Sequence, residues 1–126
     1  MATLNVYCAG AAMAVMKQIA AKFESDTGHA IAAKFGAVGA MKAPVVAGAP
    51  ADVVVLTAAL IDELIAQGLC VAGSRVDLGK VGTGVAVRAG TPLPDVSDLR
   101  VLRGNLLAAT RVMFPDPAVA TAGKVV

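Results

Sequence analysis

The sequence predicts an α/β protein whose parallel strands form an open three-layer αβα sheet. Short β-favouring runs alternate with segments of helical periodicity, and the connections between them are short. Val53 to Leu56 is a continuous apolar run, which is typical of a parallel strand covered on both faces. The composition, 57% hydrophobic but only 3% aromatic, indicates layers that pack small side chains. A chain of 126 residues suits one domain of ordinary size.

The first part of the pattern is a strand, a helix and a second strand. Leu4 to Ala9 is a β-favouring run that ends at small residues. From Met13 to Phe23 the apolar residues recur every three or four positions, which predicts an amphipathic helix that Gly28 ends. Ala30 to Phe35 is the second predicted strand.

A second helix and a third strand with its own helix follow. The second helix is predicted from about Ala40 to Ala47, and Pro44 must either lie in its first turn or kink it. The strand Val53 to Leu56 comes next, and Thr57 is placed to cap a helix from Ala58 to Gln67. This alternation predicts parallel strands joined by helical crossovers.

Downstream of that helix the character of the sequence changes. Thr83 to Arg88 is predicted as a further strand, bounded by glycines. Ser97 or Asp98 is predicted to cap a helix that runs to about Ala109. Arg111 to Phe114 is the last predicted strand.

Charge and hydropathy exclude several classes of function. The net charge is +2 and the 11 basic residues are scattered, so a nucleic acid would find neither a basic patch nor a stacking platform. No stretch of about 18 residues lacks charges or Gly/Pro breaks, so no membrane span is predicted. The first residues show no secretory leader, which predicts a cytoplasmic protein as written, or a periplasmic one if a leader was removed. Cys8 and Cys70 lie in apolar contexts and are predicted to be buried free thiols.

The titratable residues do not form a catalytic or metal-binding pattern. His29 is the only histidine and has no Cys, Asp or Glu at ligand spacing, so it is interpreted as a surface turn residue. None of the three serines lies in a nucleophile-elbow pattern. The acidic pair Asp62 and Glu63 is interpreted as the solvated face of a helix. The sequence therefore predicts no catalytic residue, no metal site, no cofactor and no enzymatic activity.

Two turns of small residues remain as candidates for ligand binding. They lie at residues 8–12, after the first predicted strand, and at residues 36–39, after the second. Ligands of open parallel sheets bind beyond the carboxyl ends of the strands, where helix N-termini offer N–H groups to an anion. Small side chains let a ligand approach the backbone closely. Small residues also serve close packing alone, and the pattern leaves both interpretations open.

Several blocks of the sequence stand out together: Val6 to Ala11, Phe23-Glu24 with Thr27-Gly28, Phe35 to Gly39, Gly48 to Val53, and Asp116-Pro117. In this order they resemble the molybdate-binding branch of the type-2 periplasmic solute-binding proteins, the substrate-binding proteins of ABC transporters. The Gly-Ala-Pro-Ala-Asp block before an apolar strand is the most specific of them. The resemblance spans nearly all of this chain but only the N-terminal half of a usual member. It implies a periplasmic-binding-protein-like lobe in residues 1–84, and a crossover with the start of a second similar lobe in residues 85–126.

The resemblance also implies a ligand and a set of residues that bind it. The ligand would be a small oxyanion, with molybdate, tungstate and sulfate as candidates, and an ABC permease would be the partner. By position, the ligand-binding residues are Gly10, Ala11, Val38, Gly39 and Met113. The family's two serines fall on Ala11 and Val38, so backbone amides would hold the anion without hydroxyls. Each missing charge-assisted hydrogen bond costs about 1.5–3 kcal/mol.

Two functions therefore stay open. The first is a small-solute-binding protein of the ABC-transporter type that performs no chemistry. The second is a truncated or degenerate paralogue that has lost oxyanion binding and acts as a self-associating or regulatory interaction module. Truncation relative to the family would expose a strand edge and an apolar helix stripe, which favours a homo-oligomer or a domain-swapped dimer.

Overall fold

A parallel three-stranded sheet forms the centre of the computed structural model, which describes residues 1–125. Its strands are β1 (Thr3–Ala9), β2 (Ala30–Gly36) and β3 (Val53–Val55), in the spatial order β2, β1, β3. In the register of the sheet Ala9 lies opposite Gly36, and Cys8 lies opposite Val55. The carboxyl ends of all three strands therefore meet at one edge.

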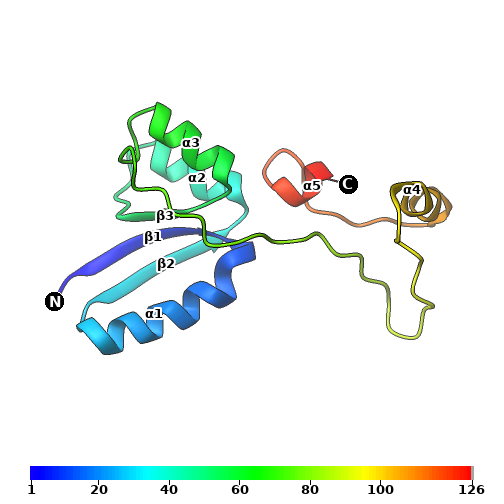
Figure 1. Ribbon diagram of the computed structural model, residues 1–126, viewed down its shortest axis with the longest axis horizontal. Coiled ribbons are helices and arrows are strands. Elements are labelled where there is room, and N and C mark those ends of the chain that lie inside the picture. Colours follow the sequence, from blue (N-terminus) through cyan, green and yellow to red (C-terminus); the bar gives the residue numbers. More distant parts are fainter. Residues whose placement is uncertain (126) are drawn as a thin grey trace.

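Helices cover both faces of this sheet and also follow it along the chain. They are the 3₁₀ turn η1 (Gly10–Ala12), α1 (Met13–Thr27), α2 (Val38–Val46), α3 (Ala58–Ala66), α4 (Leu99–Ala108) and α5 (Thr121–Val125). Figure 1 shows α1 on one face of the sheet and α2 with α3 on the other. The predicted α/β class is confirmed, and the three layers form a partial αβα lobe of the periplasmic-binding type.

The alternation of side chains along β1 explains the three layers. Val6 and Cys8 point to one face and pack with Met16 of α1. Tyr7 points to the other face and packs with Val45 of α2 and Leu64 of α3. Because β1 is buried from Val6 to Ala9, this central strand contributes to both halves of the core.

The two cysteines have different surroundings. Both are free thiols, but Cys8 is fully buried whereas Cys70 is only partly buried. The prediction of a buried free thiol is thus confirmed for Cys8 and correct only in part for Cys70. Burial raises the pKa of the Cys8 thiol, so this side chain stays protonated and behaves as a small apolar core residue.

The N-terminal ends of α2 and α3 differ from the prediction. Helix α2 begins at Val38, two residues before the predicted start, so Pro44 lies beyond its first turn. The backbone nitrogen of Pro44 carries no hydrogen, so it cannot donate the helical hydrogen bond that another residue would make at this position. Thr57 does precede α3, but its side chain makes no capping hydrogen bond. Both helices therefore begin without a side-chain cap.

Two of the predicted strands are absent from the described part of the chain. Residues 83–88 and 111–114 are neither strand nor helix, and both segments are exposed to solvent. Their β-favouring residues have no neighbouring strand to bond, and an extended run without a partner gains nothing from a ladder of hydrogen bonds. Helix α4 does form between them, with Asp98 as its cap: one carboxylate oxygen accepts from the amides of Arg100 and Val101 at 2.7 and 2.9 Å.

Asp52 ties the loop before β3 to the first strand. One of its carboxylate oxygens accepts from the backbone and the side-chain amides of Asn5, at 2.7 and 3.2 Å. The backbone amide of Asp52 donates in turn to the Asn5 carbonyl at 2.9 Å. This reciprocal pair sets the entry of β3 beside β1, which gives the Gly-Ala-Pro-Ala-Asp block a structural role.

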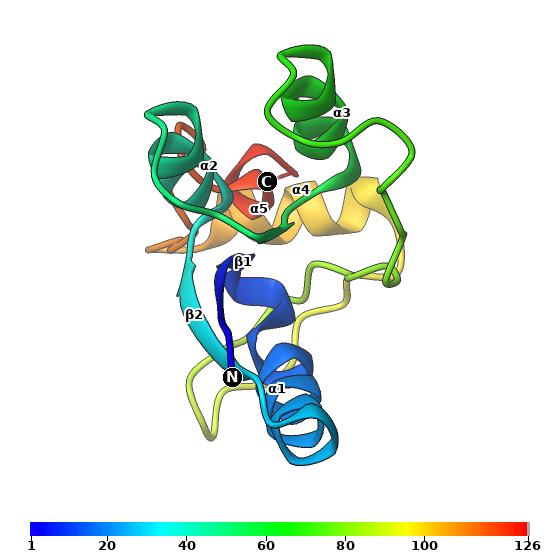
Figure 2. The same cartoon turned by 90° about the vertical axis from the view of Figure 1, so that its left-hand side faces the viewer.

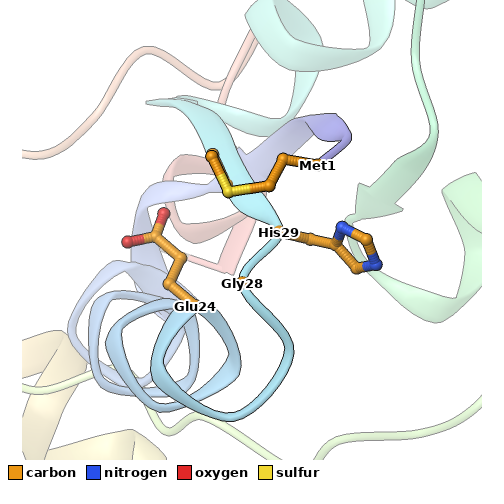
Figure 3. A pocket seen from close by; sticks show the side chains of 5 residues that line it. Met1, Glu24, Gly28 and His29 are labelled. Atoms are coloured by element: carbon orange, nitrogen blue, oxygen red, sulfur yellow. The ribbon is translucent and has the colours of Figure 1, made fainter.

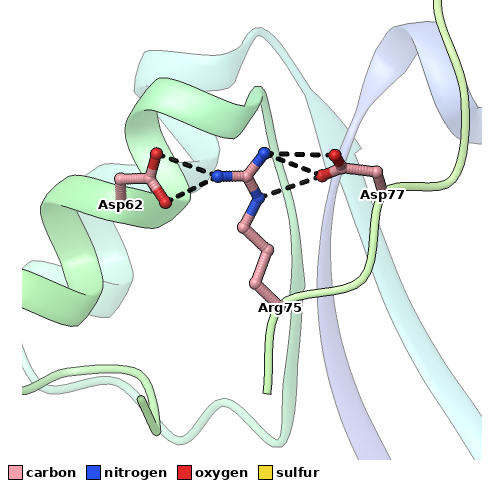
Figure 4. Close-up of polar contacts among 3 residues, drawn as sticks. All are labelled: Asp62, Arg75 and Asp77. Atoms are coloured by element: carbon pink, nitrogen blue, oxygen red, sulfur yellow. Dashed lines mark hydrogen bonds and ion pairs between the residues drawn. The ribbon is translucent and has the colours of Figure 1, made fainter. Parts of the chain in front are cut away.

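Arg75 holds the chain that leaves α3 against that helix. Its guanidinium bonds both carboxylate oxygens of Asp62 at 2.8 and 2.9 Å, and it also bonds the carboxylate of Asp77 (Figure 4). The hydrogen bond with Asp62, followed by that with Asp77, raises the pKa of Arg75. Asp62 lies on the exposed face of α3, as predicted, and is in addition the ion-pair partner of Arg75.

The rest of the chain runs away from the sheet and then returns to it. Residues 71–98 form neither helix nor strand, and they lead from α3 to α4. Figure 1 shows this extended path and the return that brings α5 near the carboxyl edge of the sheet. Val126, the last residue of the predicted second unit, lies outside the described residues. Within residues 1–125, none of the helices combines the length and the apolar character that a bilayer span requires.

Candidate functional site

The carboxyl edge of the sheet brings together the turns that follow the three strands. Since Ala9 lies opposite Gly36, the turn at Gly10 is beside the turn that leads into α2. A Cβ atom on Gly10 would lie 3.6 Å from the Gly36 carbonyl oxygen, so the two turns lie close together. Thr57 follows β3 at the same edge. The topology thus places the two predicted turns side by side, as binding at a parallel sheet requires.

A cavity of about 410 Å³ opens beside this edge, between α2, α3 and the returning end of the chain. Figure 2 shows α2, α3 and α5 around this part of the molecule. The residues that line the cavity come from all three segments: Val38, Gly39 and Lys42 from α2, Thr57, Ala59, Leu60 and Glu63 from α3 and its start, and Ala118 to Thr121 with Lys124 from the end of the chain. Its volume is in the range of small-molecule sites.

The charged side chains of the cavity are mainly basic. Within residues 1–125, the charged side chains that line it are those of Lys42, Lys124 and Glu63. Lys42 and Glu63 form an ion pair between α2 and α3. The uncapped first turns of α2 and α3 add the positive ends of two helix dipoles at the same place. This arrangement attracts a small anion, and a lysine ammonium can donate hydrogen bonds to its oxygens.

One amide in the predicted turns is already occupied by the chain itself. The N–H of Gly39 donates to the carbonyl oxygen of Val119 at 3.0 Å. A Cβ atom on Gly39 would lie 3.2 Å from that oxygen and 3.3 Å from the Val119 Cα. The glycine is therefore what allows the returning segment to approach so closely. Asp116 shapes that segment, because its carboxylate accepts from the Ala118 amide at 2.8 Å.

The predicted site residues lie in three different places. Val38 and Gly39 line the cavity, inside the first turn of α2 instead of in a turn before it. Gly10 and Ala11 lie in η1 at the adjoining turn and are exposed. Met113 is 87% exposed in the segment between α4 and α5 and does not belong to the cavity lining.

The charged residues of the cavity, unlike Val38 and Gly39, are not among the predicted site residues. Lys42 follows Val38 by four residues and so shares its helix face, a spacing that could have pointed to it. Glu63 is solvent-exposed as predicted, but it also pairs with Lys42 across 21 residues of sequence. No local pattern signals a contact of that kind, because it depends on how α2 and α3 pack on the sheet.

A second, smaller cavity lies at the opposite end of β1 and β2, with a volume of about 310 Å³. Its polar residues are Glu24 and His29, which point in different directions (Figure 3). His29 Nδ1 accepts from the Ala2 amide at 3.1 Å, and a Glu24 oxygen accepts from the Ile31 amide at 2.8 Å. Both side chains thus satisfy backbone groups, and the interpretation of His29 as a surface turn residue is confirmed.

Comparison with known proteins identifies the family. Residues 4–126 match the family model of the bacterial extracellular solute-binding proteins. A relative in Pseudomonas sp., named aconitate isomerase, is 34% identical over 121 residues. The match covers 92% of this chain and 46% of that protein, so the chain spans about half the length of this relative.

This relative corrects one prediction. The titratable residues of the sequence predict no enzymatic activity, and that prediction is wrong, because a protein similar to most of this chain is named as an enzyme. The absence of a clustered set of titratable residues in a linear sequence is thus no evidence against chemistry on this scaffold. The molybdate branch is not singled out by either comparison, whereas the broader class is: the chain belongs to the bacterial extracellular solute-binding protein family.

Proposed function

We propose that this chain forms the part of a solute-binding protein that holds a small polycarboxylate anion, of the class to which aconitate belongs. The observation that carries the proposal is the cavity at the carboxyl edge of the sheet, where Lys42 and Lys124 lie beside the uncapped first turns of α2 and α3. Isomerisation of such an acid, in a protein that includes this lobe, is the proposed activity. The name and the 34% identity of the Pseudomonas relative support it.

The side chains at the turns favour a carboxylate over molybdate. A tetrahedral oxyanion held by hydroxyls would use positions 11 and 38, which are Ala and Val here. Two lysines instead offer charge-assisted hydrogen bonds at separate points of one cavity, and such bonds are about twice as strong as neutral ones. A ligand with several carboxylates spaced along a carbon chain matches this spread of positive charge better than a compact ion.

The test is isothermal titration of the chain with trans-aconitate, molybdate and phosphate, combined with proton NMR of aconitate to follow isomerisation. We expect trans-aconitate to bind more tightly than molybdate, and the Lys124→Met variant to lose about tenfold or more in affinity. Binding of molybdate alone would instead favour the oxyanion site implied by the family resemblance. In that case the double variant Ala11→Ser with Val38→Ser should strengthen molybdate binding. If the chain binds neither trans-aconitate nor molybdate, the proposal is overturned.

The organisation of the chain and its location are also proposals. Residues 1–84 are proposed as the first lobe and residues 85–126 as the crossover with the start of a second. The family's description as extracellular supports a periplasmic location, and an ABC permease remains the proposed partner for delivery of the solute.

Self-association is a second candidate function, favoured by the exposed apolar residues downstream of α3. Leu78, Leu93, Leu99 and Leu107 are all strongly exposed, and α4 has no buried residue. Association with another surface would remove these apolar side chains from water, which favours a self-associating protein. We expect light scattering at micromolar concentration to give the mass of a dimer or a larger oligomer. A monomer mass at every protein concentration, from micromolar to about 100 times higher, would contradict this second candidate.

A further inference from the structure

An ion pair lies inside the candidate cavity and connects its two helical walls. Lys42 extends from α2 and Glu63 from α3, and both side chains line the cavity. Among the described residues that line the cavity, Glu63 is the one with a carboxylate side chain, and it offsets the charge of one of the two lysines. The cavity proposed to hold an anionic ligand thus already contains a carboxylate, that of Glu63, paired with the ammonium group of Lys42.

The two partners of this pair differ in exposure. The Lys42 side chain is 23% exposed, whereas that of Glu63 is 51% exposed. The carboxylate is therefore the partner that can leave the contact and be hydrated at little cost, while the ammonium stays in the wall of the cavity. An ion pair with one half-exposed partner contributes little to stability, so its loss does not threaten the fold.

We propose that Glu63 is an internal counter-ion of Lys42 that an anionic ligand displaces, so that the site selects ligands by their charge. A carboxylate of the ligand replaces Glu63 at Lys42 Nζ, and Glu63 turns toward solvent. Lys42 is thereby the specificity-determining residue of the site. A ligand binds only if its interaction with Lys42 is at least as favourable as the ion pair with Glu63 that it replaces. A neutral solute of the same shape cannot displace Glu63, because it offers the ammonium no charge in return. This inference rests on the proposed function, because it names how that same cavity discriminates among ligands.

The chain provides a matched control for this pair. Lys22 and Asp26 form an ion pair of 2.7 Å on the surface of α1, with side chains 78% and 54% exposed. Neither residue lines the cavity. Asp26→Asn therefore removes one carboxylate and changes the net charge of the protein by the same amount as Glu63→Gln, at a place outside the cavity.

The experiment measures the affinity of trans-aconitate and of its neutral trimethyl ester for the wild-type chain and three variants. Glu63→Gln should bind trans-aconitate about two- to fivefold more tightly, which corresponds to the strength of an exposed ion pair. Lys42→Met should bind it at least about tenfold more weakly. Asp26→Asn should match the wild type, and the ester should bind none of the four proteins measurably.

The possible failures point to different errors. If the wild type binds aconitate and Glu63→Gln binds it equally or less tightly, the exchange is overturned while the proposed function stands. If Asp26→Asn gains as much as Glu63→Gln, the effect is general electrostatics and the specific role of Glu63 is overturned. If the wild type binds no aconitate, both the function and the exchange are overturned. Equal thermal unfolding midpoints of the variants would show that a change in affinity does not come from a change in folding.

Discussion

Replacing Leu64 with alanine is expected to lower the free energy of unfolding by about 2–5 kcal/mol. Leu64 is fully buried and packs with Tyr7 and Val45, so it joins α3 to the sheet and to α2. The truncation removes apolar contacts and leaves a cavity that the surrounding layers can only partly fill. Urea denaturation followed by circular dichroism measures the loss. Because a domain of this size has a small total stability, the variant should be partly unfolded at 37 °C.

Leu107→Ala is the matched control for this variant. The same side chain is removed there, but Leu107 is 75% exposed on α4. Its free energy of unfolding should change by less than about 0.5 kcal/mol. Equal losses for the two variants would mean that α3 does not pack on the sheet as described.

Replacing Gly123 with alanine should release the returning segment from α2. Gly123 is buried, and a Cβ atom there would clash with the Pro115 carbonyl oxygen and lie 2.9 Å from the Pro117 nitrogen. Both are backbone atoms, so the turn must open to admit the methyl group, at a cost of about 1–3 kcal/mol. The Val119 carbonyl would then leave the Gly39 amide. Hydrogen exchange at that amide should accelerate about 5- to 150-fold.

Gly82→Ala is the control for this second variant. A Cβ atom on Gly82 would meet nothing within 4 Å, so the same methyl group is added without a clash. Exchange at the Gly39 amide should stay at the wild-type rate in that variant. Unchanged exchange in Gly123→Ala as well would show that the segment does not protect α2.

The first seventy residues could be predicted from the sequence because local signals and the fold agree there. The apolar run of β3 and the periodicity of α1 are both visible in the sequence, and the structure places these elements within a few residues of the predicted bounds. The segments 83–88 and 111–114 have β-favouring residues but no partner strand. Strand formation depends on such a partner, and the sequence of one segment carries no information about whether the partner exists.

The candidate site was only partly predictable for a related reason. Val38 and Gly39 were identified through the position of a turn after a strand, which the topology of a parallel sheet makes meaningful. The pairing of Lys42 with Glu63 depends on the relative placement of α2 and α3. The Val119 carbonyl is a backbone group that every residue type possesses, so no side-chain pattern could have indicated its contact with Gly39.

The hydrogen bond from Gly39 to Val119 has a consequence for any affinity measured on this chain. An anion that uses the Gly39 amide competes with an acceptor that the protein carries at a fixed and high local concentration. The apparent dissociation constant is then the intrinsic constant divided by the fraction of molecules in which the amide is free. One such bond has a net strength of about 0.5–1.5 kcal/mol, so the amide is weakened as a ligand donor by about two- to tenfold. For the proposed anion, this internal acceptor would therefore lower the apparent affinity at the α2 end of the cavity by the same factor at every ligand concentration.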